Sequence, residues 1–195
     1  MTFNDYDVLS YIEEHARSIM GDDPAHGWPH VKRVIRNAEL IVSGERISVD
    51  WLSLRASIYL HDVGRFLPGG GHHVAKSVSY ASKLLTKLGL PKRVIGAVVH
   101  AIEAHSYSYG VKPVTVEAIV LSDADKLDAL GAVGIARVFH YGCINNRSFD
   151  DSVTHMVEKL LNIPSRLILP SSKKLARERL SIIEGFIRQY QSETI

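Results

Sequence analysis

Apolar residues recur at intervals of three and four along most of this 195-residue chain, and this periodicity limits the possible folds more than any other feature. Such spacing places apolar side chains on one face of a helix, where they can pack into a core. Glycine, proline and capping residues separate the periodic stretches. Nine helical stretches are expected, at about residues 5–20, 31–44, 50–61, 72–88, 91–105, 113–130, 135–139, 156–161 and 176–190.

The chain has neither a convincing alternating strand pattern nor the two-residue signals of a tight hairpin. We therefore predict an all-α fold, with 1–195 forming a single helical domain. Residues 20–140 hold the core motifs in this prediction, and C-terminal helices at about 150–191 pack on them. Three irregular stretches are expected to be loops: 66–71, 145–149 and 163–172.

Composition limits the classes of function. Hydrophobic residues make up 46% and charged residues 23%, as in an ordinary folded protein. A net charge of +2 argues against a dedicated nucleic-acid binder, although a local positive patch for an anionic ligand is compatible with it. One cysteine, no signal-like start and no apolar run long enough for a membrane span lead to the expectation of a cytoplasmic protein without a membrane partner. A homodimer is compatible with the sequence, and nothing in it requires one.

The ten histidines indicate metal or acid–base chemistry. His61 and Asp62 are adjacent at the end of an apolar helical stretch, where two neighbouring side chains can point at one ion. His26 and His30 stand four apart, a spacing that places both on one face of a helix. Downstream, 123–128 brings three aspartates into an otherwise apolar helix, and buried carboxylates need a cation or another partner.

These residues occur in an order that resembles the HD-domain metal-dependent phosphohydrolase superfamily. The matching segments are HVKRVIRNA (30–38), YLHDVGR (59–65) and DADKLDALG (123–131). The resemblance implies an all-helical domain in which one divalent metal is bound by His30, His61, Asp62 and Asp125. Asp125 fits the Ala-Asp-x-Leu pattern better than Asp123 does.

Some members of the superfamily hold a second metal through two further histidines. The segments GHHVAKS (71–77) and AIEAHS (101–106) resemble the regions that supply them. His73, favoured over its rival His72, and His105 would then be ligands, with Asp62 bridging two ions. In related single-metal enzymes, histidines in these regions contact phosphate or water instead, so both interpretations stay open.

Three further residues have candidate catalytic roles. His26 resembles the general acid of cyclic-nucleotide phosphodiesterases, and its alternative role is to orient His30. Arg65 can bind a phosphate or form a surface ion pair. Lys126 can neutralise charge on a phosphoryl group or pair with Asp123 or Asp128, which are otherwise expected to support or cap the site. The remaining histidines are expected to be structural: His15, His100, His140 and His155.

The leading hypothesis is hydrolysis of a phosphoester or phosphoanhydride, with a nucleotide as substrate, by attack of metal-bound hydroxide. Mixed nitrogen and oxygen donors suit Mn²⁺ first, with Fe, Ni, Co or Zn as alternatives. Two other hypotheses are a di-iron oxygenase of the HD-domain type and a non-catalytic nucleotide-binding regulatory module. Substrate specificity is expected to reside in three segments: 66–73, 106–109 and 137–141.

Overall fold

The computed structural model describes residues 4–194, and every regular element within that range is a helix. The prediction of an all-α fold is confirmed. Local sequence explains the helix ends: the side chain of Asn4 accepts the N–H of Asp7 at the start of α1 (Asp5–Met20), and Gly21, with φ of 57°, ends it.

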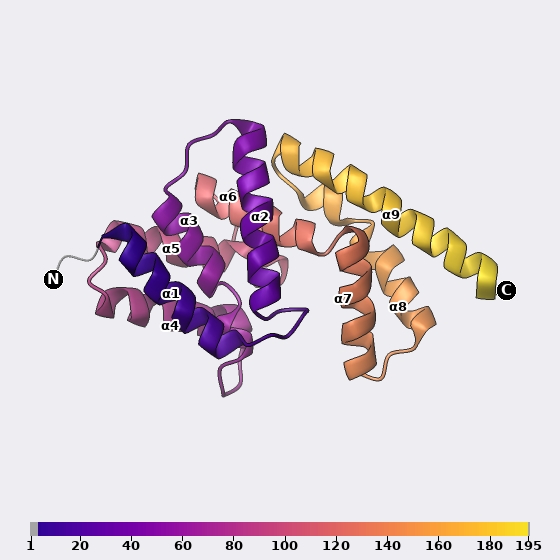
Figure 1. Cartoon of the computed structure of the whole chain (residues 1–195), viewed down its shortest axis with the longest axis horizontal. Coiled ribbons are helices and arrows are strands. Elements are labelled where there is room, and N and C mark those ends of the chain that lie inside the picture. The colour runs from indigo at the N-terminus through magenta and orange to yellow at the C-terminus, as the bar shows by residue number, and fades with distance from the viewer. Residues whose placement is uncertain (1–3, 195) are drawn as a thin grey trace.

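The first six helices form a bundle that carries most of the apolar core (Figure 1). After α1 these helices are α2 (Trp28–Glu45), α3 (Trp51–Leu60), α4 (His73–Lys87), α5 (Lys92–His105) and α6 (Val116–Asp128). Helix α6 packs against both α2 and α5, α3 lies between α1 and α5, and α4 packs on α5. Two short 3₁₀ turns, η1 (Val63–Arg65) and η2 (Tyr107–Tyr109), follow α3 and α5.

The C-terminal part consists of α7 (Gly131–Ile144), α8 (Phe149–His155), the π-helical turn η3 (Met156–Leu160), the 3₁₀ turn η4 (Ile163–Arg166) and α9 (Pro170–Thr194). Helix α9 packs against α7, α2 and α6. Figure 1 shows this long helix beginning beside the upper end of α2, with α7 and α8 below it. The division of the chain into one domain remains a prediction.

Several helix boundaries were predicted wrongly. Helix α7 continues to Ile144 because Gly142 faces the next helix, where a Cβ would lie 2.7 Å from the Ser152 hydroxyl oxygen. Close packing at a glycine leaves no apolar signal in the sequence. The helical stretch expected at 156–161 is the π-helical continuation of α8. Part of the expected loop 163–172 is helical, because the Asp123 carboxylate accepts the N–H groups of Ile168 and Leu169 and fixes the start of α9.

In the part of the chain that the structure describes, no single helix is both long and apolar enough to cross a membrane. The pair α6 and α7 meets the criterion of length and composition together, but a 70° bend separates the two helices.

Candidate metal centre

The predicted site residues gather where several helices of the bundle begin or end. His30 lies in the first turn of α2, His61 and Asp62 follow the last residue of α3, and His105 is the last residue of α5. His73 begins α4, and Asp125 lies on α6. Residues spread over about half of the sequence therefore meet in one small region.

Gly64 permits this convergence. A Cβ on Gly64 would lie 2.0 Å from the carbonyl oxygen of His73 and 2.7 Å from the backbone nitrogen of Ser77. Only glycine allows the turn after Asp62 to press against the first turn of α4, and the Gly64 N–H donates to the Ser77 hydroxyl at 2.9 Å. The His-Asp pair and His73 are brought together by this close contact.

The imidazole rings of His30 and His61 face each other through their Nε2 atoms. His30 Nδ1 lies 2.7 Å from the Asp128 carboxylate, and His61 Nδ1 lies 2.7 Å from the Ile58 carbonyl oxygen. Each Nδ1 is therefore a donor, which leaves a lone pair on each Nε2. The two Nε2 atoms are only 3.1 Å apart. Two lone pairs in this position fit a shared cation, either a proton or a metal ion.

Two carboxylates complete this first cluster. Asp125 Oδ1 lies 3.4 Å from His30 Nε2 and 3.9 Å from His61 Nε2. Asp62 Oδ2 lies 3.9 Å from His61 Nε2. His30, His61 and Asp62 offer ligand atoms within 4.8 Å of one another, and all three side chains are buried. The structure thus brings together the four residues that were predicted to bind one metal.

A second cluster shares Asp62. Its Oδ1 atom lies 3.4 Å from His73 Nε2 and 3.8 Å from His105 Nε2. His105 Nδ1 donates to the Ile102 carbonyl at 2.6 Å, so its Nε2 also presents a lone pair. Asp62 Oδ1 is buried and has no hydrogen-bond partner among the described residues. A buried carboxylate oxygen facing two imidazole nitrogens fits a cation.

Arg65 lies against this second cluster. Its Nε donates to Asp62 Oδ2 at 2.6 Å, and its Nη2 donates to His73 Nε2 at 3.2 Å. The guanidinium therefore places a fixed positive charge beside the second cluster and engages one of its ligands. Arg65 does form an ion pair, as one of the two predictions for it stated, but its partner is the buried Asp62 and not a surface residue.

The protonation states of these groups suit a metal. Burial lowers the pKa of His61 to about 4, against an opposing effect of Asp62. Burial, followed by the charge of Arg65, lowers the pKa of His73 to about 4. Burial of Asp62 opposes its ionisation, but His61 and Arg65 outweigh this effect and hold the pKa of Asp62 well below its usual range. Neutral imidazoles and ionised carboxylates together fit a divalent transition metal.

His72 and Lys126 lie to the side of the ligand atoms. The Nδ1 of His72 accepts the Val74 N–H at 3.2 Å and caps α4, so of the two rivals only His73 faces Asp62. The Lys126 ammonium donates to the hydroxyl of Ser122 and, at 3.0 Å, to its carbonyl oxygen. It makes no ion pair with an aspartate among the residues that the structure describes, and burial lowers its pKa.

The backbone position of His26 differs from the prediction. The residue lies in the turn before α2 and not on the same helix face as His30, because the Asp23 carboxylate accepts its N–H at 2.7 Å and forms the turn. Its ring still stands beside that of His30, with centroids 6.4 Å apart. Burial and then Arg65 lower the pKa of His26 to about 4, so the ring is neutral at pH 7.

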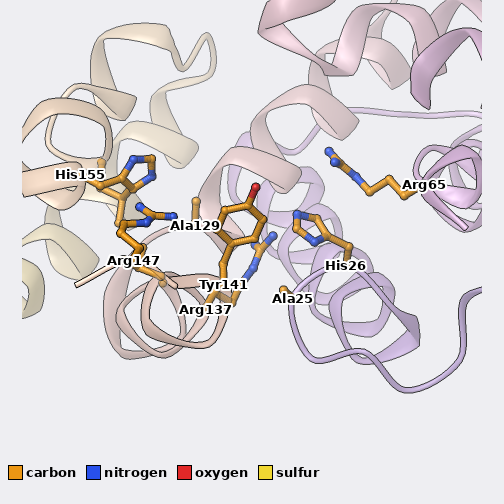
Figure 2. Close-up of a pocket in the computed structure, with 11 residues that line it drawn as sticks. Ala25, His26, Arg65, Ala129, Arg137, Tyr141, Arg147 and His155 are labelled. Atoms are coloured by element: carbon orange, nitrogen blue, oxygen red, sulfur yellow. The ribbon is translucent and has the colours of Figure 1, made fainter. Parts of the chain in front are cut away.

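A cavity of about 360 Å³ opens beside the two clusters. Figure 2 shows His26 and Arg65 on one side, Arg147 and His155 on the opposite side, and Arg137 with Tyr141 between them. The Arg147 guanidinium stands over the Tyr141 ring, 5.3 Å from its centroid. Sequence reasoning assigned no role to Arg147 and placed His155 among structural histidines. Neither belongs to a motif, so only the folding of the C-terminal helices reveals them.

A second cavity of about 230 Å³ continues from the first over the candidate metal ligands. Both are lined by His26, Arg65 and Arg137, and the second adds Asp62, Asp125, Lys126 and Arg166. Arg166 stacks on Tyr107 at 4.2 Å from the ring centroid. The basic side chains around these two cavities outnumber the acidic ones, so the region favours an anionic ligand.

The other predicted structural histidines lie outside both clusters. His15 stacks on Tyr11, with ring centroids 4.6 Å apart. His100 Nε2 accepts the Val114 N–H at 3.1 Å, and His140 faces the carboxylate of Asp23 at 3.6 Å.

Comparison with known sequences identifies a family. The HD-domain profile matches residues 27–130, which is more than half of the chain. *Bacillus subtilis* YpgQ, an uncharacterized protein, is 31% identical over 192 residues, spanning 93% of this chain and 91% of YpgQ. The YpgQ match extends beyond the profile into the C-terminal helices.

Solved structures agree with this result. The crystal structure of YpgQ in complex with ADP is similar with a TM-score of 0.79 and 27% identity, over 97% of this chain and 96% of that one. A predicted HD-superfamily hydrolase from an uncultured Thermotogales bacterium has a TM-score of 0.68 and 30% identity, over 96% of this chain and 91% of that one. An HD-superfamily hydrolase from Bacillus thuringiensis has a TM-score of 0.76 and 26% identity, over 97% of this chain and 98% of that one. The chain therefore belongs to the HD-domain family and, within it, to the HD-superfamily hydrolases.

Proposed function

We propose that this protein is a metal-dependent phosphohydrolase that cleaves a phosphoester or phosphoanhydride bond of a nucleotide. One observation carries the proposal: the buried cluster of His30, His61 and Asp62 lies next to cavities lined by arginine and lysine. A metal-ligand set alone fits many reactions. A metal-ligand set beside a cationic cavity fits a phosphorylated substrate.

In this proposal His30, His61, Asp62 and Asp125 hold a divalent transition metal tightly, with Mn²⁺ first and Fe, Co, Ni or Zn as alternatives. When bound, such an ion lowers the pKa of a coordinated water from about 15.7 towards about 7 and supplies a nucleophile near neutral pH. The orphaned Oδ1 of Asp62 supports a second, weaker ion at His73 and His105. Arg65 opposes that ion because it already engages His73.

The cationic side chains would position and neutralise the phosphate. Arg65 is held by Asp62 and Arg137 by Asp128, so each guanidinium is fixed while other N–H groups remain available for phosphate oxygens. A positioned phosphate places negative charge beside His26, which raises the low pKa of that ring. His26 can then hold a proton and donate it to the departing oxygen. Lys126 contributes positive charge from the wall of the cavity.

A nucleotide is the proposed substrate for two reasons. Cavities of about 360 and 230 Å³ lie near the lower end of the range for small-molecule sites, and Tyr107 and Tyr141 offer aromatic surface beside arginines. A homologous structure, that of YpgQ, is a complex with ADP. A small organic substrate of a di-iron oxygenase is the second candidate, and only the second cluster at Asp62 favours it.

The test is incubation of the metal-loaded protein with Mn²⁺ and a panel of nucleoside triphosphates, diphosphates, monophosphates and cyclic nucleotides. Asp62→Asn serves as the inactive variant. His15→Ala is the matched control, because His15 lies on α1 and stacks on Tyr11. Phosphate, pyrophosphate and nucleoside products are followed separately.

We expect turnover of at least one nucleotide class by the wild-type protein and by His15→Ala, and none by Asp62→Asn. Tight binding of nucleotides without turnover of any would overturn the proposal in favour of a regulatory module. Two irons per chain with oxygen-dependent conversion of a small organic compound, and no phosphate release, would overturn it in favour of an oxygenase.

A further inference from the structure

A third cavity, of about 350 Å³, is separate from the two at the metal centre and shares no lining residue with them. It is formed by α2, by the junction of α6 and α7, and by α9, the three parts that meet near the centre of Figure 1. The proposed reaction gives this cavity no role. Its lining combines two features, a group of arginines and a group of exposed apolar side chains.

The arginines are Arg33, Arg36 and Arg179, against a single carboxylate, Asp128, in the lining. That carboxylate already makes hydrogen bonds to other side chains. Arg33 donates to both of its oxygens at 2.7 and 3.0 Å, and Oδ2 also contacts His30 Nδ1 and Arg137 Nη1, each at 2.7 Å. Asp128 therefore does not neutralise the other two arginines by direct contact.

Arg36 is the least constrained of the three. It is exposed and makes no hydrogen bond or ion pair with any residue in the described range 4–194. Arg179, by contrast, is held in place by the Leu127 carbonyl at 2.6 Å and by the Asn37 side-chain oxygen at 2.7 Å. A fixed guanidinium beside an uncommitted one is a suitable arrangement for a phosphate group.

The apolar part of the lining comes from three helices. Leu40 of α2, Val133 of α7 and Ile182 of α9 are 43%, 40% and 48% exposed, respectively. Single exposed apolar side chains are common, but three from separate helices around one cavity form an apolar wall. An apolar wall beside arginines matches a ligand that joins a flat or apolar group to an anion.

We propose that this cavity is a second, non-catalytic binding site for a nucleoside phosphate. The phosphate would lie against Arg36 and the outer edges of Arg33 and Arg179, and the base would lie against Leu40, Val133 and Ile182. Inorganic phosphate would satisfy only the arginines, and an uncharged nucleoside only the apolar wall. Both parts of the ligand are therefore needed for tight binding.

The third cavity is linked to the metal centre through two side-chain contacts. Arg33 contacts Asp128, and Asp128 contacts His30. Arg33 also donates to the Pro24 carbonyl at 3.0 Å, two residues before His26. A phosphate that draws Arg33 outward leaves more negative charge on the Asp128 carboxylate facing His30, which strengthens His30 as a metal ligand. Occupancy of the cavity is therefore expected to raise Mn²⁺ affinity.

The experiment counts nucleotide sites without turnover. Calorimetric titration uses α,β-methylene-ADP, whose bridging carbon resists hydrolysis, in the presence of Mn²⁺. The test variant is Arg36→Gln. The matched control is Lys32→Gln, which removes the same charge from an exposed position on the same helix and lines none of the cavities described. A second variant, Val133→Asp, places a negative charge at the apolar wall, and thermal unfolding verifies that all variants fold.

We expect two nucleotides per chain for the wild-type protein and for Lys32→Gln. In Arg36→Gln one of the two sites should weaken by about tenfold or more, as for loss of a charge-assisted contact. Val133→Asp should weaken the same site. Asp62→Asn should lose the catalytic site and keep this one, so failure of the proposed reaction and failure of this inference are distinguishable.

A single nucleotide site per chain that Arg36→Gln leaves unchanged, or two unchanged sites in Arg36→Gln, would overturn the inference. A change in oligomeric state in Arg36→Gln with unchanged nucleotide binding would also overturn it, because the cavity would then be an interface between copies of the chain. Inorganic phosphate binding as tightly as the nucleotide analogue would reduce the site to a simple anion site and contradict the role of the apolar wall.

Discussion

The two clusters that share Asp62 differ in how firmly their ligands are held. In the first, His30 and His61 are fully buried, and each Nδ1 is anchored by an acceptor. In the second, His105 is anchored in the same way, but the His73 side chain is 17% exposed and accepts a hydrogen bond from Arg65. The first cluster is preorganised for a metal, whereas the second must displace a guanidinium contact to receive one.

This difference shows how one carboxylate can serve two purposes. Asp62 Oδ1 faces the imidazoles of the second cluster, and Oδ2 lies near His61 while holding Arg65. The ion pair with Asp62 thus places the Arg65 guanidinium, which we propose binds phosphate, next to the candidate metal ligands. We expect metal affinity to be high on the anchored side and lower on the side of Arg65.

The largest effect is expected from removing an anchored ligand. His61→Ala should abolish tight Mn²⁺ binding and turnover together, because it removes an imidazole whose lone pair faces the centre. His105→Ala should keep the tight ion and lose only the weaker one. Metal content after dialysis, measured with activity, checks both variants. Equal loss of the tight ion in the two variants would contradict the distinction between the clusters.

Asp128→Asn tests the anchoring of the first cluster. The amide removes the negative charge that orients His30, so Mn²⁺ affinity should fall by about 10–100-fold, as for other residues that support a metal-binding histidine. Asp123→Asn on the same helix is the matched control, since Asp123 holds backbone N–H groups of 168 and 169 and contacts no metal-binding histidine. It should lower the unfolding temperature without altering metal affinity.

Arg65→Gln should have opposite effects on the two functions of the site. Loss of the guanidinium should raise the KM for a phosphorylated substrate by about tenfold. It should also increase the affinity of the second cluster for Mn²⁺ by several-fold, because His73 is released. Substrate kinetics and a two-site metal titration measure both quantities. Arg55→Gln, which removes an exposed ion pair with Glu39 and a contact with the Trp51 ring, should change neither.

A smaller effect is expected on the pH dependence of stability. The pKa values of His26, His61 and His73 are each lowered to about 4 in the folded protein, against an ordinary value of 6.5. Below pH 6.5 the unfolded chain therefore binds more protons than the folded one, which favours unfolding. The metal-free protein should lose stability as the pH falls from about 6.5 to about 4. Denaturant unfolding across this range tests the direction, and a gain in stability would contradict it.

Much of this arrangement was accessible from the sequence. Helical periodicity predicted the all-α fold. The resemblance to the HD-domain superfamily implied that His30, His61, Asp62 and Asp125 bind one metal, and the structure brings these residues together. The family resemblance, now confirmed, led to His73 and His105. Local sequence was also sufficient to predict the two ends of α1, at the capping residue Asn4 and at Gly21.

The remaining features depend on contacts between distant segments. The anchoring of His30 by Asp128 links residues 98 positions apart, and the cavity wall at Arg147 and His155 forms only when the C-terminal helices fold back. His26 was placed on the wrong element because the side chain of Asp23, and not helical spacing, fixes its turn. Periodicity reports which face of a helix is buried, but not which partner it meets.

The most direct test of the account is the Mn²⁺ affinity of the wild-type protein and of Asp62→Asn, titrated from the metal-free state. Asp62 is the one residue that both clusters share, and the amide keeps its size while removing its charge. We expect Asp62→Asn to lose tight Mn²⁺ binding and nucleotide turnover together while retaining its fold. An Asp62→Asn protein that binds Mn²⁺ as tightly as the wild type would contradict the assignment of the metal centre.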